Sequence, residues 1–139
     1  MTAATGFAVG IDLVRVSRIA ESIRCFGPRF LNRLFTPDEQ AYATADPAVA
    51  AERLAARFAA KEATRKALRL GDGIGWRQIE VRRNPDGACD LVLHDRAAEL
   101  AGAAEIALSM SHEGDLATAV VMIRRFEPLP TSKSEQSHG

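Results

Sequence analysis

The stretch 57–67 reads RFAAKEATRKA and lies in the longest alanine-rich segment of the chain, at about residues 47–70. Alanine is the strongest helix former, so this segment predicts one long helix. The helix is expected to end at a loop in which three glycines predict unusual backbone angles: Gly71, Gly73 and Gly75. Every other element has to pack around a helix of this length, and the stretch therefore decides the fold.

Charged residues divide between two sides of this helix. At about 100° per residue, Glu62 and Lys66 fall inside the arc of apolar side chains, whereas Arg53, Arg57 and Thr64 point to the more solvated side. An ion pair between Glu62 and Lys66 on a weakly buried face would explain the first two, at roughly 0.2–0.5 kcal/mol. A functional role is the alternative, and spacing alone does not choose between them.

Asp12 is a second charge in an apolar context, because residues 7–16 predict a buried strand. A buried carboxylate is costly unless it is paired, hydrogen-bonded or bound to a cation. One interpretation is that Asp12 caps the helix expected to begin near Ser17. The other is that Asp12 meets Glu62, because two carboxylates together with phosphate oxygens and water suit octahedral Mg2+.

The other predicted elements complete a compact single domain of the α+β class. Helices are expected at residues 17–23, from a capping box at 36–39 through 42, and at 96–104, and later strands at 76–83, 89–93, 106–111 and 116–123. Helices grouped between hairpins favour a mostly antiparallel sheet around the long central helix over a parallel doubly wound sheet. The domain is expected over residues 1–126, and residues 127–139 predict a disordered tail.

Composition argues against several classes of protein. Eighteen basic and eighteen acidic residues balance, which leaves no overall footprint for nucleic acid or an anionic membrane. No run approaches the ~20 apolar residues that span a bilayer, and the first residues lack the layout of a signal peptide, so we expect a cytoplasmic protein. Cys25 and Cys89 lack metal-ligand spacing and are expected to be free thiols. Residues 15–33 hold five arginines and one acid, a local balance of +4 that suits an acidic partner.

His112 closes the run Ser-Met-Ser-His at residues 109–112, at the expected end of a strand. A single histidine in this place is most often a turn or core residue. Its polar neighbours also suit the rim of an anion-binding site, and both interpretations stay open.

Three motifs follow one another along the chain: Gly10-Ile11-Asp12 with Arg18-Ile19, the block 57–63 with Lys66-Ala67, and the run 109–112. Their order and separations resemble the holo-acyl-carrier-protein synthase family of 4′-phosphopantetheinyl transferases over about residues 6–124. The resemblance implies the 4′-phosphopantetheinyl transferase fold and a Mg2+-dependent transfer of 4′-phosphopantetheine from coenzyme A to a serine of apo-acyl carrier protein. Adenosine 3′,5′-bisphosphate would be released, and fatty acid biosynthesis is the expected process.

The resemblance also implies roles for individual residues. Asp12 and Glu62 would bind Mg2+ together with the pyrophosphate of coenzyme A, and Lys66 would contact the phosphates. Coenzyme A binding is implied for Arg53, Arg57, Lys66, Gly71, Gly73 and His112, and docking of the carrier protein for Arg18, Arg29 and Arg33. The family forms homotrimers with active sites between subunits, so Arg57 and His112 would act from the neighbouring subunit.

The chain departs from the family pattern in three places. Arg69 stands where many relatives have a glycine, and Gly87-Ala88-Cys89 replaces a common Gly-x-Pro. Basic residues that many relatives carry before the long helix are missing at 48–50. Binding of the 3′-phosphate is therefore expected to depend more on Arg53, Arg57 and His112.

Three questions stay open at the level of sequence. The carrier protein could serve fatty acid, polyketide or peptide synthesis. The base that accepts the serine proton could be Glu62 or a metal-bound water that Asp12 positions. A trimeric module that binds nucleotide or carrier protein without turnover is the alternative outside enzymes, and the presence of Asp12, Glu62 and Lys66 argues against it.

Overall fold

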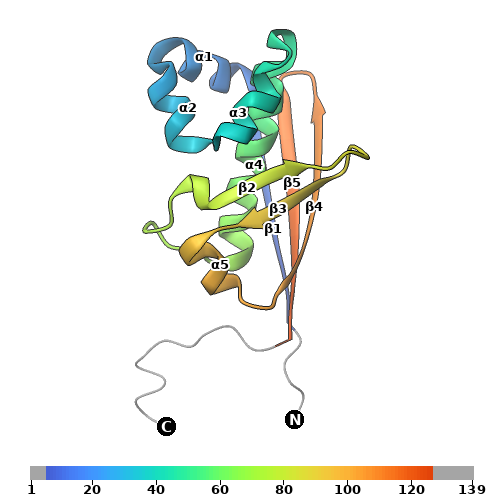
Figure 1. The fold of residues 1–139 in the computed structure, drawn as a ribbon. Helices are drawn as coiled ribbons and strands as arrows, with labels where there is room; N and C mark the ends of the chain where they lie inside the picture. Colours follow the sequence, from blue (N-terminus) through green and yellow to red (C-terminus); the bar gives the residue numbers. More distant parts are fainter. Residues whose placement is uncertain (1–5, 127–139) are drawn as a thin grey trace.

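The computed structural model describes residues 6–126, and it confirms an α+β domain. In chain order the elements are β1 (Gly6–Arg15), α1 (Val16–Phe26), α2 (Pro28–Leu34), α3 (Pro37–Thr44), α4 (Ala50–Leu68), β2 (Ile79–Arg83), β3 (Cys89–Leu93), α5 (Asp95–Ala101), β4 (Glu105–Glu113) and β5 (Leu116–Arg125) (Figure 1). Short 3-10 turns at Pro47–Val49 and Trp76–Gln78 precede α4 and β2. The tail predicted at 127–139 lies outside the described residues.

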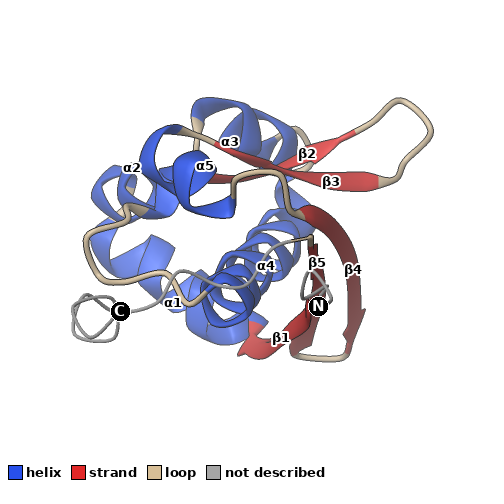
Figure 2. Cartoon of the chain, turned by 90° about the horizontal axis from the view of Figure 1, so that it is seen from below, coloured by secondary structure: helices blue, strands red, loops and turns tan. Residues whose placement is uncertain are grey.

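Two antiparallel sheets flank α4. The larger one has the strand order β1-β5-β4, and β2 pairs with β3 as a separate hairpin. Figure 2 shows the three-stranded sheet on one side of α4, with the β2–β3 hairpin on another. At residue 10 the strand and the helix come so close that a Cβ would lie 1.9 Å from the carbonyl oxygen of Ala63, so only glycine fits there.

The prediction of a buried strand at the N-terminus is half wrong. In β1, Gly10 and Val14 are buried against α4, but the alternate side chains point away from the helix. Phe7 is 71% exposed and Leu13 is 61% exposed, and Val9 and Ile11 resemble them. An apolar run of this kind predicts a strand covered on both faces, whereas a single chain covers only one face.

Three local predictions also need correction. No helix was predicted between residue 23 and the capping box at 36–39, but the structure has α2 there, with Pro28 in its first turn. Residues 76–78, predicted as strand, form a 3-10 turn instead. Unusual backbone angles were predicted for the glycines of the loop after α4. Among the described residues of this loop, the positive φ belongs to Arg69, at 56°, and none of the three glycines has a positive φ. The helix ends there with a left-handed C-cap, a position that glycine occupies most readily.

The prediction of which side of α4 faces water is wrong in part. Arg57 is 4% exposed and Thr64 is fully buried, although both were predicted on the solvated side, while the Lys66 side chain is 54% exposed. Helix α3 and strand β2 pack against the side of α4 that was expected to face water. Alanine is common on every side of this helix, so the pattern cannot show which sides other elements cover.

A buried ion pair joins these elements. The capping box of α3 forms as predicted, with Thr36 and Glu39 bonding each other's backbone amides. Glu39 has a second role, because its Oε1 accepts from Lys61 Nζ at 2.8 Å and its Oε2 from the Val81 amide at 2.8 Å. Lys61 also donates to the carbonyls of Trp76 and Ile79, and both side chains of the pair are fully buried. The sequence analysis missed Lys61.

Candidate active site

A cavity of about 530 Å³ opens where β1, α1, α2 and α4 meet. Its walls combine charged and apolar side chains, among them Asp12, Arg15, Arg18, Ile19, Phe58 and Glu62. Phe58 and Glu62 are one helical turn apart on α4, and the ring of Phe58 packs against Trp76 with centroids 5.2 Å apart. The two carboxylates that the sequence singled out therefore line one cavity.

Asp12 forms an ion pair with Lys66. Lys66 Nζ lies 3.2 Å from Asp12 Oδ1 and donates to the carbonyl of Ile11 at 2.8 Å. The side chain of Asp12 is 19% exposed, so the cation partly compensates for its burial. Lys66 thus joins α4 to β1, and the proposed pairing of Lys66 with Glu62 along the helix is not the one that the structure contains.

The helix-cap interpretation of Asp12 is wrong, because another aspartate takes that role. Asp115, in the turn between β4 and β5, accepts from the Ser17 amide at 2.8 Å and from the Ser17 hydroxyl at 2.5 Å. These hydrogen bonds lower the pKa of Asp115. Nothing in the turn Glu113-Gly114-Asp115 predicted that Asp115 would bond Ser17, which lies 98 residues earlier in the chain.

Glu62 lies near a like charge. Burial raises the pKa of its carboxyl group, and the charge of Asp12 raises it further, while Arg65 and Lys66 oppose the shift. Two neighbouring carboxylates repel each other unless a proton or a cation lies between them. Within residues 6–126, no three or more His, Cys, Asp or Glu side chains are grouped so that they could hold a metal ion by themselves. A pair of carboxylates still fits Mg2+, which takes one or two carboxylates and fills its other positions with water and substrate phosphates.

The arginines predicted to bind coenzyme A form a cluster with Tyr42 of α3. The guanidinium carbons of Arg53 and Arg57 each lie 4.4 Å from the centre of the Tyr42 ring. Burial lowers the pKa of Arg57. The Tyr42 cluster was not foreseen, because Tyr42 entered the sequence analysis only as the end of a short helix.

His112 and the two glycines are not among the residues that line the Asp12 cavity of one chain. His112 is at the end of β4 with its side chain 56% exposed, and its Nδ1 lies 3.5 Å from Glu52 Oε2. The interpretation of His112 as a core residue is therefore wrong. Gly71 and Gly73 lie in the exposed loop after α4, where Arg65 donates to the Gly71 carbonyl at 3.4 Å.

The predicted docking arginines divide between two hollows. Arg18 lines the Asp12 cavity, whereas Arg29 and Arg33 line a neighbouring hollow of about 380 Å³ together with Phe26 and Phe30. Phe26 is 63% exposed. An exposed aromatic ring beside two arginines makes this surface both apolar and basic, and the sequence analysis had identified only the basic part.

The family model of the 4′-phosphopantetheinyl transferase superfamily (ACPS) matches residues 8–121, which include most of β1, the Asp12 cavity and β4. The chain belongs to the 4′-phosphopantetheinyl transferase superfamily. Two curated relatives carry the name holo-[acyl-carrier-protein] synthase. The protein from Koribacter versatilis is 47% identical over 119 residues, covering 82% of this chain and 94% of the relative, and that from Moorella thermoacetica is 46% identical over 118 residues, covering 82% and 91%.

Solved structures of the same family share the fold. The ACPS–CoA complex of Chronobacterium ammoniagenes superposes with a TM-score of 0.77 at 34% identity, covering 86% of this chain and 97% of that chain. The acyl carrier protein synthase of Mycobacterium tuberculosis superposes with a TM-score of 0.69 at 36% identity, covering 85% and 97%. The predicted family, the fold and the enzyme class of a 4′-phosphopantetheinyl transferase are thereby confirmed.

Proposed function

We propose that this transferase moves 4′-phosphopantetheine from coenzyme A to a serine of an apo-acyl carrier protein and releases adenosine 3′,5′-bisphosphate. The observation that carries the proposal is that Asp12 and Glu62 line one cavity while Lys66 forms an ion pair with Asp12. Relatives with 41–47% identity are named for this activity, and a related structure holds CoA.

Asp12 and Glu62 are the residues that would hold Mg2+. When bound, the ion would supply positive charge against the pyrophosphate of coenzyme A. Lys66 sits beside Asp12 and would stabilise the charge that develops on the departing nucleotide. Arg18, in the same cavity wall, would face the incoming carrier protein.

The serine oxygen would form a bond to the β-phosphorus as the bond from that phosphorus to the bridging oxygen of the nucleotide breaks. The electron pair leaves with the nucleotide, and the product is a phosphodiester. Two groups are candidates for accepting the serine proton, Glu62 and a water that Asp12 positions. Phe58 and Ile19 provide apolar wall in the cavity, which strengthens the electrostatic contacts there.

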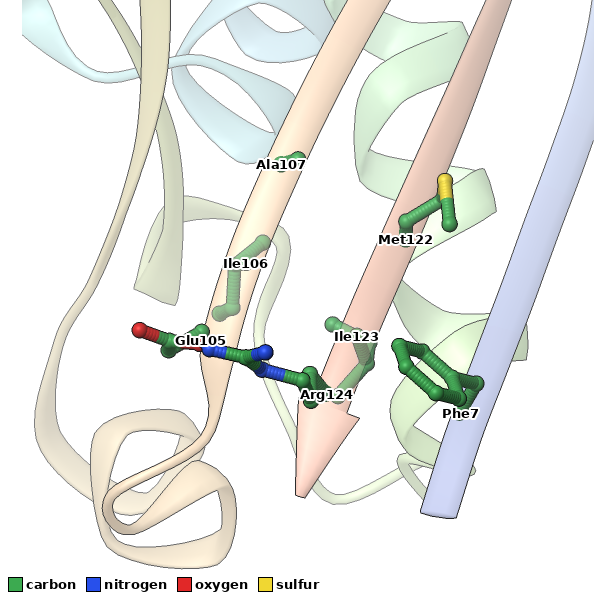
Figure 3. Close-up of a pocket in the computed structure, with 7 residues that line it drawn as sticks. All are labelled: Phe7, Glu105, Ile106, Ala107, Met122, Ile123 and Arg124. Carbon is green, nitrogen blue, oxygen red and sulfur yellow. Dashed lines mark hydrogen bonds and ion pairs between the residues drawn. The ribbon is translucent and has the colours of Figure 1, made fainter. Parts of the chain in front are cut away.

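A homotrimer with active sites between subunits is part of the proposal. The outer face of β1 and the neighbouring Met122, which is 50% exposed, present an apolar surface that a second copy could cover. Figure 3 shows one end of this surface, where Phe7 and Met122 lie on different strands and Arg124 pairs with Glu105 through a 2.6 Å hydrogen bond. Assembly would also bring His112 of one chain to the cavity of another.

Light scattering would test the assembly, with a trimer as the expected result. Mixing Glu62→Ala with His112→Ala subunits should then restore some of the transfer that each variant lacks, because a mixed trimer contains intact composite sites. An active monomer would contradict the shared site.

Docking of the carrier protein would use Arg18, Arg29 and Arg33, with Phe26 as an apolar contact among them. Surface charges mainly govern the rate of encounter, and salt screens them over a Debye length of ~10 Å at 0.1 M. Arg29→Glu should therefore raise the KM for the carrier protein and leave the KM for coenzyme A unchanged. The same KM for the carrier at every salt concentration would contradict the docking surface.

Mass spectrometry of apo-carrier protein incubated with the enzyme, coenzyme A and Mg2+ tests the whole proposal. The expected result is a gain of one phosphopantetheine that disappears with excess chelator and with Asp12→Ala or Glu62→Ala. Carrier proteins of fatty acid, polyketide and peptide synthesis, tested side by side, would identify the partner class. Nucleotide binding without any transfer would favour the non-catalytic module.

A further inference from the structure

The side chain of Arg65 holds the loop that joins α4 to the 3-10 turn before β2 (Figure 1). Its guanidinium group donates to the carbonyl of Ile74 and, at 3.4 Å, to the carbonyl of Gly71. The Ile74 amide donates to the same Gly71 carbonyl at 3.2 Å and closes a turn. One side chain of the helix therefore binds both ends of a turn in the loop.

The backbone of Arg65 supports the same loop. Its carbonyl accepts from the amide of Arg69 and, at 3.0 Å, from the amide of Leu70. Arg69 is the left-handed C-cap of α4 and stands where many relatives have a glycine. Arg65 thus ends the helix through its backbone and fixes the following residues through its side chain.

The guanidinium group of Arg65 also lies over an aromatic ring. Its central carbon is 4.0 Å from the centre of the Trp76 ring. Trp76 packs in turn against Phe58, with ring centroids 5.2 Å apart, and Phe58 lines the Asp12 cavity. A planar guanidinium can stack on a ring while the N–H groups at its edge bond carbonyls. The contacts of Arg65 therefore extend from the loop to the wall of the cavity.

The charge of Arg65 is not used in an ion pair. Within residues 6–126, Arg65 forms no salt bridge with a carboxylate, and its Nε is buried without a hydrogen-bond partner. A partly buried charge is costly unless other contacts offset the loss of water. In this part of the chain, the contacts that offset it are the two loop carbonyls and the ring of Trp76.

We propose that Arg65 is a positioning residue, which holds the loop at 69–75 and the wall formed by Trp76 and Phe58 in place for the phosphopantetheine donor. This inference rests on the proposed function, and the resemblance to the family implies that Gly71 and Gly73 bind coenzyme A. A ligand that meets a loop already in its bound conformation avoids the entropic cost of ordering it.

Arg65 should act on binding of the donor and not on the chemical step, because it does not line the Asp12 cavity. Arg65→Met keeps the length of the side chain and removes the charge and the donors. The KM for coenzyme A should rise about tenfold, since ordering the backbone of one residue costs about that factor. The kcat and the KM for the carrier protein should stay within about twofold. A role in the fold alone would lower kcat with the folded fraction and leave the KM unchanged.

Arg65→Lys separates the geometry of the side chain from its charge. The charge of Arg65 lowers the pKa of Glu62, and a lysine keeps a charge at this position. An ammonium group cannot stack flat on the Trp76 ring while it bonds the loop carbonyls. The KM for coenzyme A should therefore stay several-fold above that of the parent. A KM equal to that of the parent would show that charge alone suffices and would overturn the positioning role.

Trp76 is the single tryptophan of the chain, so its fluorescence reports on this contact directly. Acrylamide should quench the fluorescence of Arg65→Met more than that of the parent, because the guanidinium group no longer covers the ring. Arg77→Ala is the matched control, since Arg77 follows Trp76 but donates to the Asn32 carbonyl at 3.4 Å. The control should change neither the quenching nor the KM. Equal quenching in Arg65→Met and the parent would contradict the proposal.

Calorimetry with coenzyme A distinguishes this role from the proposed function. If the unsubstituted protein transfers nothing and Arg65→Met still weakens binding of coenzyme A about tenfold, the proposed function fails and the positioning role stands. If transfer proceeds and Arg65→Met leaves both the Kd and the KM for coenzyme A unchanged, the positioning role fails and the proposed function stands.

Discussion

Lys61 and Lys66 of α4 are five residues apart and have opposite surroundings. Lys61 is fully buried, and its ammonium group is satisfied by Glu39 and by the carbonyls of Trp76 and Ile79. The Lys66 side chain is 54% exposed and pairs with Asp12, next to a cavity that also contains Glu62. The first lysine has no capacity left for a ligand, whereas the second keeps an open side.

One helix therefore carries a lysine whose donors are all satisfied and a lysine that stays partly open. Lys61 connects α4 to α3 and to the start of β2, which sets the rotation of the helix about its axis. That rotation decides which side chains of α4 line the cavity, namely Phe58 and Glu62. Burial and complete hydrogen bonding give Lys61 a role in the fold, and a partly open ion pair beside a second carboxylate fits the catalytic role proposed for Lys66.

The largest expected effect is on stability, at Lys61. Lys61→Ala leaves the buried carboxylate of Glu39 without its cation, which typically costs about 3–5 kcal/mol of unfolding free energy. Urea denaturation measures this loss. The double variant Glu39→Gln with Lys61→Met is the control, because it removes both charges and should recover part of the stability. A loss below about 1 kcal/mol in Lys61→Ala would show that the pair does not hold the fold together.

The second effect is on catalysis, at Lys66. Lys66→Ala should slow transfer roughly 100-fold, the usual loss when one stabilising donor is removed from a transition state. Because its ion pair is partly solvated, the unfolding free energy should change by less than about 1 kcal/mol. Single-turnover kinetics together with urea denaturation separate these quantities. If transfer falls only as far as the folded fraction does, the two lysines have the same role.

A third effect concerns the end of α4, three residues beyond Lys66. Arg69 has a left-handed conformation, so Arg69→Gly should stabilise the protein by about 0.5–1 kcal/mol. Transfer should stay within about twofold, which would separate stability from chemistry at this end of the helix. A lower melting temperature in calorimetry would show that the Arg69 side chain stabilises the loop by more than its backbone costs.

The smallest effect concerns pH and involves Glu62, which lies between the two lysines in sequence. Its pKa is raised in the folded chain by burial and by Asp12, so the folded state binds more protons than the unfolded state between the two pKa values. Stability contributed by this group is therefore lost as pH rises through that window. In the absence of divalent metal, Glu62→Gln should melt at a higher temperature than the parent at pH 7 and at the same temperature well below the ordinary pKa of Glu. Equal melting temperatures at both pH values would contradict the repulsion.

Sequence patterns singled out Asp12, Glu62 and Lys66 because each is a charge inside an apolar pattern, and the resemblance to the family supplied the roles proposed for them. The same reasoning failed for Lys61 and Arg57. On a helix with alanine on most sides, periodicity does not tell which side a distant hairpin covers.

Other features could not be predicted because they depend on spatial neighbours. Arg83 reaches Tyr42 only after the hairpin packs beside α3, and Asp115 reaches Ser17 only after β5 pairs with β1. The exposed face of β1 was misjudged because an apolar strand has the same pattern whether its second face meets its own chain or another copy. Local patterns such as the capping box at Thr36 were predicted correctly, since all of their atoms lie within one turn.

Gly10 has a consequence for anyone who would redesign this enzyme. The absence of a single methyl group lets β1 lie against α4, and Asp12 and Glu62 are each within two residues of that contact. The close approach at Gly10 therefore sets how near the backbones that carry Asp12 and Glu62 lie to each other. A larger residue at position 10 would push β1 away from α4, which would widen the site for a bulkier donor and also loosen the core beneath it.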